Sequence, residues 1–151
     1  MQMSYWRFAA MIATSTLVMF GLMYLTTYQL EHVLWSETRA WMALVMGSVM
    51  AIIMLSYMLK MYKNTMINLS IFGGSIIVFA LSLWLVRSQT TINDVDYMKA
   101  MVPHHSIAIM TSLRAQISDP RVRKLADEII EAQRREIAEM EFLIDELEKV
   151  N

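Results

Sequence analysis

The sequence predicts an all-α protein in which three transmembrane helices are followed by an antiparallel helical hairpin outside the membrane. Hydropathy is the first observation, because 56% of the 151 residues are hydrophobic and the mean hydropathy is +0.40. Charge is the second, because charged residues are sparse before Trp84 and dense from Arg87 onward. We therefore predict a three-span transmembrane domain at residues 1–88 and a soluble helical hairpin domain at residues 89–151.

Three uncharged apolar stretches are each about 20 residues long, enough to cross a ~30 Å hydrocarbon core as a helix. They are residues 8–28, 41–59 and 66–86. No small-x-small cleavage site follows the first stretch before Glu31, so it is interpreted as a retained helix and not a signal peptide. Aromatic residues flank the spans as interfacial belts do; they are Tyr5, Trp6, Tyr28, Trp35, Trp41, Tyr62 and Trp84.

The basic residues predict the orientation. Arg7 precedes the first span, and Lys60 and Lys63 lie between the second and third. Because Lys and Arg favour the inner side, the N-terminus is expected to be cytoplasmic. Three spans then place the C-terminal domain on the outer side of the membrane, with membrane lipid as the surrounding partner.

A methionine stripe occupies the second span at every fourth position: Met42, Met46, Met50, Met54 and Met58. This spacing keeps successive thioethers adjacent on a helix. It resembles the MxxxM motif of eukaryotic copper-uptake channels, which implies a copper transporter as one alternative. The other interpretation is apolar packing.

The C-terminal part predicts two helices. Asn93 or Asp94 can cap the first, which is expected to reach about Ile117 with a kink or restart at Pro103. Asp119 and Pro120 form the N-cap and first position of the second, which is expected to reach about Lys149. Its apolar face recurs with helical periodicity; the members are Val122, Ala126, Ile129, Ile130, Ile137, Met140, Leu143, Ile144 and Leu147.

A two-helix hairpin of this size buries too little apolar surface to be stable alone. We therefore expect two copies to pair into a four-helix bundle, most simply as a symmetric homodimer. The alternative is that the hairpin packs on the transmembrane domain or on a different protein.

Folding the hairpin about Ser118 and Asp119 predicts which side chains become level. His104 and His105 come opposite Gln133, Met101 opposite Glu136, and Met98 opposite Met140. Imidazole binds several transition metals and thioether selects Cu(I), so a mixed site without Cys favours copper. Met98, Met101, His104, His105, Met110 and Met140 are the candidate ligands, and Gln133 and Glu136 are expected to orient the imidazoles. The hydrogen-bonded-core interpretation of the same residues stays open.

Several function classes are disfavoured. There is no Cys, so no thiolate site exists, and the net charge of −1 gives no reason to expect nucleic acid. No Ser-His-Asp arrangement, phosphate loop or Glu-x-x-His di-iron motif is legible, so no enzyme activity is predicted.

The segment 94–147 resembles the bacterial family called domain of unknown function 305. The residues that carry the resemblance are Met98, the run Met101-Val-Pro-His-His105, Ala108, Met110, Ala126, Ile129, Ile130, Gln133, Glu136, Ile137 and Met140. It implies a ferritin-like helical bundle, copper binding outside the cytoplasm, and His104, His105, Met101, Met110 and Met140 as ligands. The hypothesis is a membrane-anchored protein of copper sequestration or homeostasis, with Cu(I) or Cu(II) undetermined. Its rivals are the transporter and a non-metal membrane assembly module.

Overall fold

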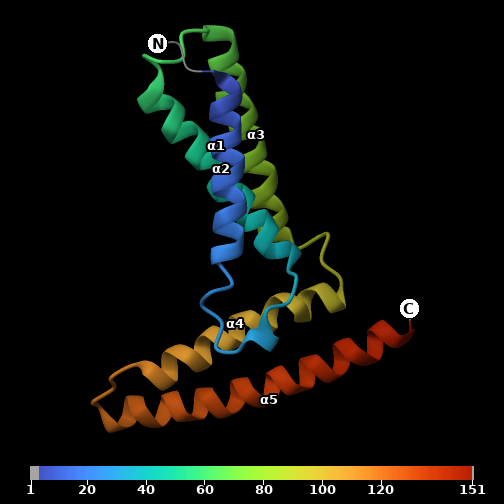
Figure 1. Ribbon diagram of the computed structural model, residues 1–151. Coiled ribbons are helices and arrows are strands. Elements are labelled where there is room, and N and C mark those ends of the chain that lie inside the picture. The colour runs from blue at the N-terminus through green and yellow to red at the C-terminus, as the bar shows by residue number, and fades with distance from the viewer. Residues whose placement is uncertain (1–3, 151) are drawn as a thin grey trace. The chain divides into compact units, whose positions relative to one another are not determined.

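The computed structural model describes residues 4–150, and every regular element in that range is helical (Figure 1). The α-helices are α1 (Tyr5–Leu22), α2 (Glu37–Met58), α3 (Thr65–Ser88), α4 (Asp94–Arg114) and α5 (Pro120–Val150), with one short 3-10 helix, η1 (Leu30–His32). They form two compact units. We call residues up to 23 with 38–91 the three-helix unit, and residues 24–37 with 92 onward the hairpin unit.

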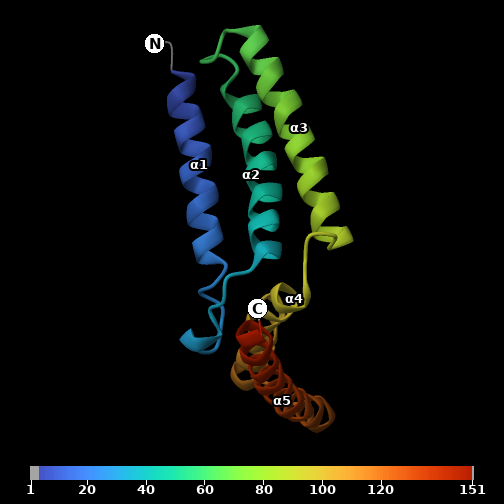
Figure 2. The same ribbon diagram turned by 90° about the vertical axis from the view of Figure 1, so that its right-hand side faces the viewer.

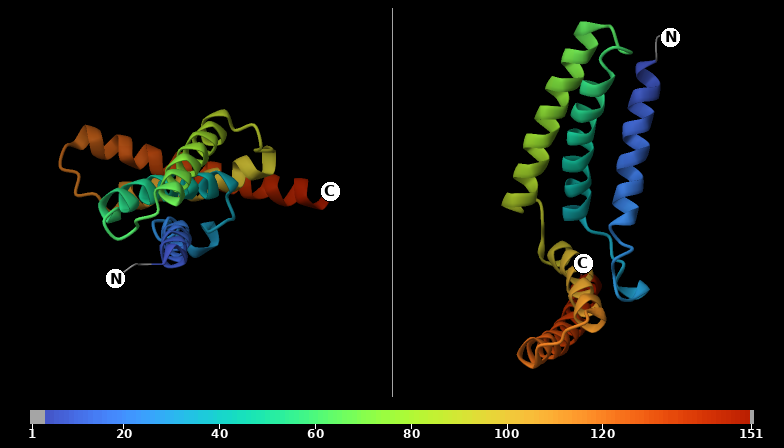
Figure 3. Two further views of the ribbon diagram at one scale, coloured as in Figure 1. Left: turned by 90° about the horizontal axis from the view of Figure 1, so that it is seen from above. Right: turned by 90° about the vertical axis from the view of Figure 1, so that its left-hand side faces the viewer.

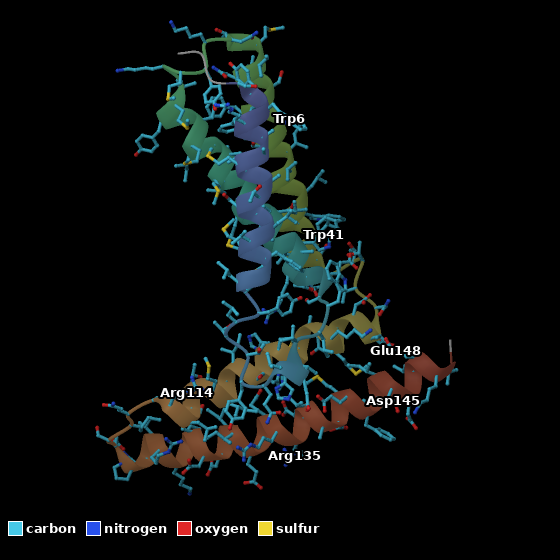
Figure 4. The ribbon with its side chains drawn as sticks, in the orientation of Figure 1. Trp6, Trp41, Arg114, Arg135, Asp145 and Glu148 are labelled. Atoms are coloured by element: carbon cyan, nitrogen blue, oxygen red, sulfur yellow. The ribbon has the colours of Figure 1, made fainter. Side chains whose placement is uncertain are left out.

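The three-helix unit contains α1, α2 and α3, which run side by side and alternate in direction (Figure 2; Figure 3, right). All three are long and apolar enough to cross a membrane, with mean hydropathies of 1.2, 1.9 and 2.2. Trp6 and Trp41 mark opposite ends of this unit (Figure 4). The predicted spans 41–59 and 66–86 therefore agree closely with α2 and α3.

The first span is shorter than predicted. α1 ends at Leu22, where the N–H of Met23 donates to the Met19 carbonyl, so residues 23–28 of the predicted span are not part of this helix. Beyond this end, Tyr28 packs against the apolar core of the hairpin unit.

Small and aromatic residues pack the three-helix unit. Its core contains Phe8, Ala51, Leu55 and Tyr62. Tyr62, in the connection between α2 and α3, is only 1% exposed and belongs to this core. Gly47 is where α1 and α2 approach closely, since a Cβ there would lie 2.4 Å from Thr16 Oγ1.

Helices α4 and α5 form the antiparallel hairpin predicted from the sequence (Figure 1). The Asn93 side chain accepts from the Asp96 N–H and caps α4, which ends at Arg114, earlier than predicted. Asp119 accepts from the backbone N–H of Arg121 at the start of α5. The side chain and backbone N–H of Arg121 together lower the pKa of the Asp119 carboxyl below its ordinary value. Arg114 lies near the turn, whereas Asp145 and Glu148 lie toward the far end of α5 (Figure 4).

Pro103 does not interrupt α4, which is continuous from Asp94 to Arg114. The predicted restart is therefore wrong. Pro103 is fully buried in the hairpin unit, and packing there offsets the loss of one backbone hydrogen bond.

The face of α5 is buried only along its centre. Ala126, Ile130, Ile137 and Ile144 are buried, as the periodicity predicts. Other members of the predicted face remain between 38% and 48% exposed, namely Val122, Leu143 and Leu147. The hairpin thus retains apolar surface on its own outer side.

The segment between α1 and α2 belongs to the hairpin unit. Tyr28 and Leu34 pack against the cluster formed by Val102, Ile109, Ile130 and Ile137. The predicted division at residues 88 and 89 placed this segment in the transmembrane domain, whereas its contacts are with α4 and α5. Part of the hairpin's core is therefore covered by the same chain.

Candidate metal centre

His105 is the centre of the candidate site. It lies on the α4 face that packs against α5, and it is 9% exposed. Its Nδ1 atom lies 3.0 Å from the Met101 carbonyl oxygen, one turn earlier. Its Nε2 atom lies 2.7 Å from Glu136 Oε2 on α5. Both ring nitrogens are therefore held, and the ring orientation is defined from both helices.

The hydrogen bonds of His105 require a shared proton. A carbonyl oxygen can only accept, so Nδ1 carries a hydrogen and donates it to Met101. Nε2 and a carboxylate oxygen would both be acceptors, and two acceptors at 2.7 Å repel unless a proton lies between them. A metal cation bound by both side chains would replace this hydrogen bond and would need the two atoms to separate, because metal–nitrogen and metal–oxygen bonds of about 2 Å each do not fit in line across 2.7 Å.

The observed pairing corrects the predicted register by three residues. Glu136 faces His105, where the sequence analysis placed Gln133 opposite His105 and Glu136 opposite Met101. Helical side chains lean toward the N-terminus of their own helix. In this hairpin they lean away from the turn on α4 and toward it on α5. Contacting residues on α5 therefore lie farther from the turn than backbone level predicts.

The other predicted ligands are not equally placed. Met98 is buried, and Met101, Met110 and Met140 are half-buried. Met140 packs against the hairpin cluster. His104 is exposed, and its ring centroid lies 6.1 Å from that of His105 at an interplanar angle of 63°. The structure thus brings His105 and Glu136 together and leaves His104 on the outer side.

Within residues 4–150 no group of three or more His, Asp and Glu side chains converges in a way that could hold a metal. A metal at this position would therefore need further ligands of another type beside the His105–Glu136 pair. Thioethers are available on both helices, from Met98 and Met101 on α4 and from Met140 on α5. Gln133 is half-buried on α5, and no hydrogen bond links it to His105.

A second histidine site was missed by the sequence analysis. His32, in η1, is 7% exposed, and its Nδ1 lies 2.8 Å from Ser106 Oγ. The Tyr28 N–H donates to the same oxygen at 2.7 Å, so the hydroxyl proton of Ser106 is available to His32. Ser106 is fully buried, and its hydrogen bonds to Tyr28 and His32 hold the segment before α2 against α4.

The sequence contains only weak signals for the contact between His32 and Ser106. His32 is one of three histidines in the chain, and it is followed by the apolar run Val33, Leu34 and Trp35. A cleft of about 230 Å³ lies beside it. Its lining side chains are Tyr28, Gln29, His32, Ile109, Arg134, Ile137, Ala138 and Glu141.

The methionine stripe of α2 changes environment along the helix. Met42 and Met46 are 43% and 38% exposed, Met50 is half-buried, and Met54 and Met58 pack against the core of the three-helix unit. A repeat of four residues exceeds the 3.6 residues of one helical turn, so the stripe drifts around the helix. The apolar cleft of about 640 Å³ in this unit is lined from α2 by Leu44, Gly47, Ser48 and Ala51, with no methionine.

Comparisons with known proteins agree with the resemblance of the C-terminal segment. Residues 86–150 match the family described as Domain of unknown function (DUF305). This match covers α4 and α5 completely. The chain is also similar to Uncharacterized protein L153 of Acanthamoeba polyphaga mimivirus, with 38% identity over 74 residues. That alignment covers 48% of this chain, which spans about half (49%) of the length of the relative. No solved structure matches.

Proposed function

We propose that this protein is a membrane-anchored metal-binding protein of the cell envelope that holds copper through His and Met side chains. The pairing of His105 with Glu136 carries the proposal, because it brings an imidazole and a carboxylate, two groups that bind metal ions, together across α4 and α5. The Met101 carbonyl fixes the ring from the opposite side, which is how metal-binding histidines are oriented in proteins. Copper supplies no reaction in this proposal; it is bound reversibly.

The donor set is consistent with copper. The chain has no Cys, and three methionines flank the His105–Glu136 pair along the two helices. Thioether sulfur selects Cu(I), and imidazole accepts either oxidation state of copper. Anchoring is supported by α1, α2 and α3, which are long and apolar enough to cross a membrane. The proposed orientation puts α4 and α5 outside the cytoplasm.

The decisive experiment measures copper in the full-length protein purified from membranes. Glu136→Gln keeps the size of the side chain but removes its charge, and it should lower copper affinity by about 10–100-fold. Glu139→Gln is the matched control, because Glu139 is an exposed carboxylate on the same helix. His105→Ala with His104→Ala should abolish the binding. Equal copper content in all variants would reject the site.

Replacing sulfur tests the ligands directly. Met101→Leu and Met140→Leu preserve apolar volume and remove the thioether, so they should weaken Cu(I) binding while leaving the melting temperature of the metal-free protein unchanged. A parallel loss of melting temperature and copper would show that these methionines are packing residues only.

An assembly module is the second candidate, and the exposed apolar side chains of α5 favour it. Leu125 and Phe142 are 56% and 60% exposed, beside the partly exposed Leu143 and Leu147. We propose that these side chains pair two hairpins into a four-helix bundle. Cross-linking in native membranes should trap a dimer, and Phe142→Ser should reduce it. A dimer without any copper would favour the assembly role over the metal role.

A further inference from the structure

The three-helix unit contains basic residues and no acidic ones. Its basic residues are Arg7, Arg39, Lys60, Lys63 and Arg87, and no Asp or Glu occurs in residues 4–23 or 38–91. All the carboxylates of the chain therefore lie in the hairpin unit. A cation in the three-helix unit has no acidic side chain of that unit to neutralise it.

Three of these cations lie at the same end of the three-helix unit. Arg7 is in the first turn of α1, and Lys60 and Lys63 are in the connection between α2 and α3. All three side chains are exposed, and none makes an ion pair or hydrogen bond with the residues from 4 to 150. Residues 4–150 thus supply no counter-charges to these three side chains. At the surface of a bilayer, lipid phosphates provide them.

A pocket of about 430 Å³ lies beside Lys63, and its lining changes from polar to apolar along α3. Lys63 and Thr65 are at the start of the helix, and Leu69 and Phe72 follow one and two turns later. At 1.5 Å per residue, Phe72 lies roughly 10 Å deeper than Thr65. The remaining lining residues are Leu59, Tyr62 and Asn68. A polar opening above an apolar floor matches the chemistry of a phospholipid.

Hydrogen bonds within the protein hold one wall of this pocket. The Tyr5 hydroxyl donates to Asn68 Oδ1 at 2.9 Å, and Asn68 Nδ2 donates to the Tyr62 carbonyl at 2.7 Å. The Tyr62 ring lies 4.9 Å from the ring of Tyr5 and 5.5 Å from that of Phe8. Because these contacts satisfy Asn68, Lys63 and the Thr65 hydroxyl are the groups available to a ligand.

The backbone at the start of α3 adds to the attraction for an anion. The side-chain oxygen of Asn64 accepts from the Ile67 N–H, and the backbone carbonyl of Asn64 accepts from the Asn68 N–H. The preceding N–H groups of the first turn carry the partial positive charge of the helix dipole. They lie at the same end of the helix as Lys63.

We infer that this pocket binds an anionic phospholipid, with the phosphate at Lys63 and Thr65 and the upper acyl chain along Leu69 and Phe72. The inference rests on the membrane anchoring in the proposed function and does not involve the copper site. It deepens that function by assigning a lipid class to a specific pocket at one end of the anchor.

The test compares lipid affinities of the full-length protein by native mass spectrometry, using phosphatidylglycerol and phosphatidylcholine with identical acyl chains. Lys63→Ala should lower phosphatidylglycerol affinity more than tenfold. Lys60→Ala removes the same charge from the same connection but does not line the pocket, so diffuse attraction limits its effect to about fivefold. Equal losses of phosphatidylglycerol affinity in the two variants would contradict lipid binding in this pocket.

A charge-neutral variant tests the apolar floor. Leu69 is 67% exposed, so Leu69→Trp should fold normally, fill the pocket and abolish the preference for phosphatidylglycerol. Inorganic phosphate should not displace the lipid, because it lacks the acyl chain; full displacement would overturn the lipid assignment.

Copper content is measured in the same samples. Retained copper with no lipid preference would reject this pocket alone, and failure to insert into vesicles would reject both it and the proposed anchoring.

Discussion

The two units of this protein are stabilised by different kinds of contact. In the three-helix unit, small residues bring helices together, as at Gly47 and Thr16, and ion pairs within the unit are impossible because it has no carboxylate. In the hairpin unit, polar pairs such as His105–Glu136 and His32–Ser106 lie inside or beside an apolar cluster. Shape complementarity therefore dominates the first unit, and directed hydrogen bonds add to burial in the second.

Under the proposed function, this difference follows from the solvent around each unit, lipid for the three-helix unit and water for the hairpin unit. Lipid tails are as apolar as the side chains they replace, so helices in a membrane gain mainly from close packing. In water, burial of apolar area drives association, and buried polar groups must be paired. The buried side-chain nitrogen and oxygen atoms of residues 4–150 all have a hydrogen-bond partner. The following substitutions test the contrast, from the largest expected effect to the smallest.

Ile109→Ala should destabilise the hairpin unit by about 2–5 kcal/mol, because Ile109 is 1% exposed and its loss leaves a cavity in the cluster. Hydrogen exchange of α4 and α5 amides in the full-length protein measures it. Leu113→Ala, at a side chain 42% exposed on the same helix, should change little. Similar effects of the two substitutions would contradict a burial-driven hairpin.

Gly47→Ala should destabilise the three-helix unit by roughly 1–3 kcal/mol, since the new methyl group overlaps Thr16. Thermal unfolding in detergent measures the change. Gly74→Ala should be neutral because its Cβ has nothing within 4 Å. Adding Thr16→Ala to Gly47→Ala should restore the stability. Persistent destabilisation of the double variant would show that the close approach is not the cause.

Ser106→Ala should cost about 1–3 kcal/mol by leaving the Tyr28 N–H and His32 Nδ1 without their partner. The expected readout is faster hydrogen exchange at the Tyr28 amide, because the segment before α2 opens more often. Ser118→Ala is the control, since Ser118 is exposed in the hairpin turn. Unchanged exchange at Tyr28 would mean that apolar contacts alone hold the segment.

Asp119→Asn should have the smallest effect, a slight loss of hairpin stability at neutral pH. The folded state lowers the pKa of Asp119, so its ionised form stabilises the fold above the ordinary carboxyl pKa. This contribution is lost as the pH falls through the folded pKa. The melting-temperature difference between wild type and variant should therefore disappear in acid, and a constant difference would point to a cap that does not depend on charge.

Sequence reasoning worked best where a single helix carries the signal. Asn93 and Pro120 mark helix starts because capping and proline geometry act over a few residues. The centre of the α5 face followed the period of one helix. The restart predicted at Pro103 was wrong, because residue type does not encode the neighbours that bury this side chain.

The sequence predicted which residue types form the candidate site, and the structure corrected which of these residues face one another. The pattern singled out His105 and Glu136 but paired each with the wrong residue. The pairing was counted from backbone positions, and helical side chains point toward the N-terminus of their own helix. His32 and Ser106 are 74 residues apart, and no local pattern joins them.

The sequence by itself determined the number of helices, the apolar character of three of them and the chemistry of the candidate ligands, because these depend on composition and on periodicity within one helix. Only the tertiary structure decided that the segment between α1 and α2 packs on the hairpin, that Glu136 faces His105 and that Lys63 borders an amphipathic pocket. Those facts depend on which surfaces meet, and contacts between distant segments are set by shape and by side-chain direction in three dimensions.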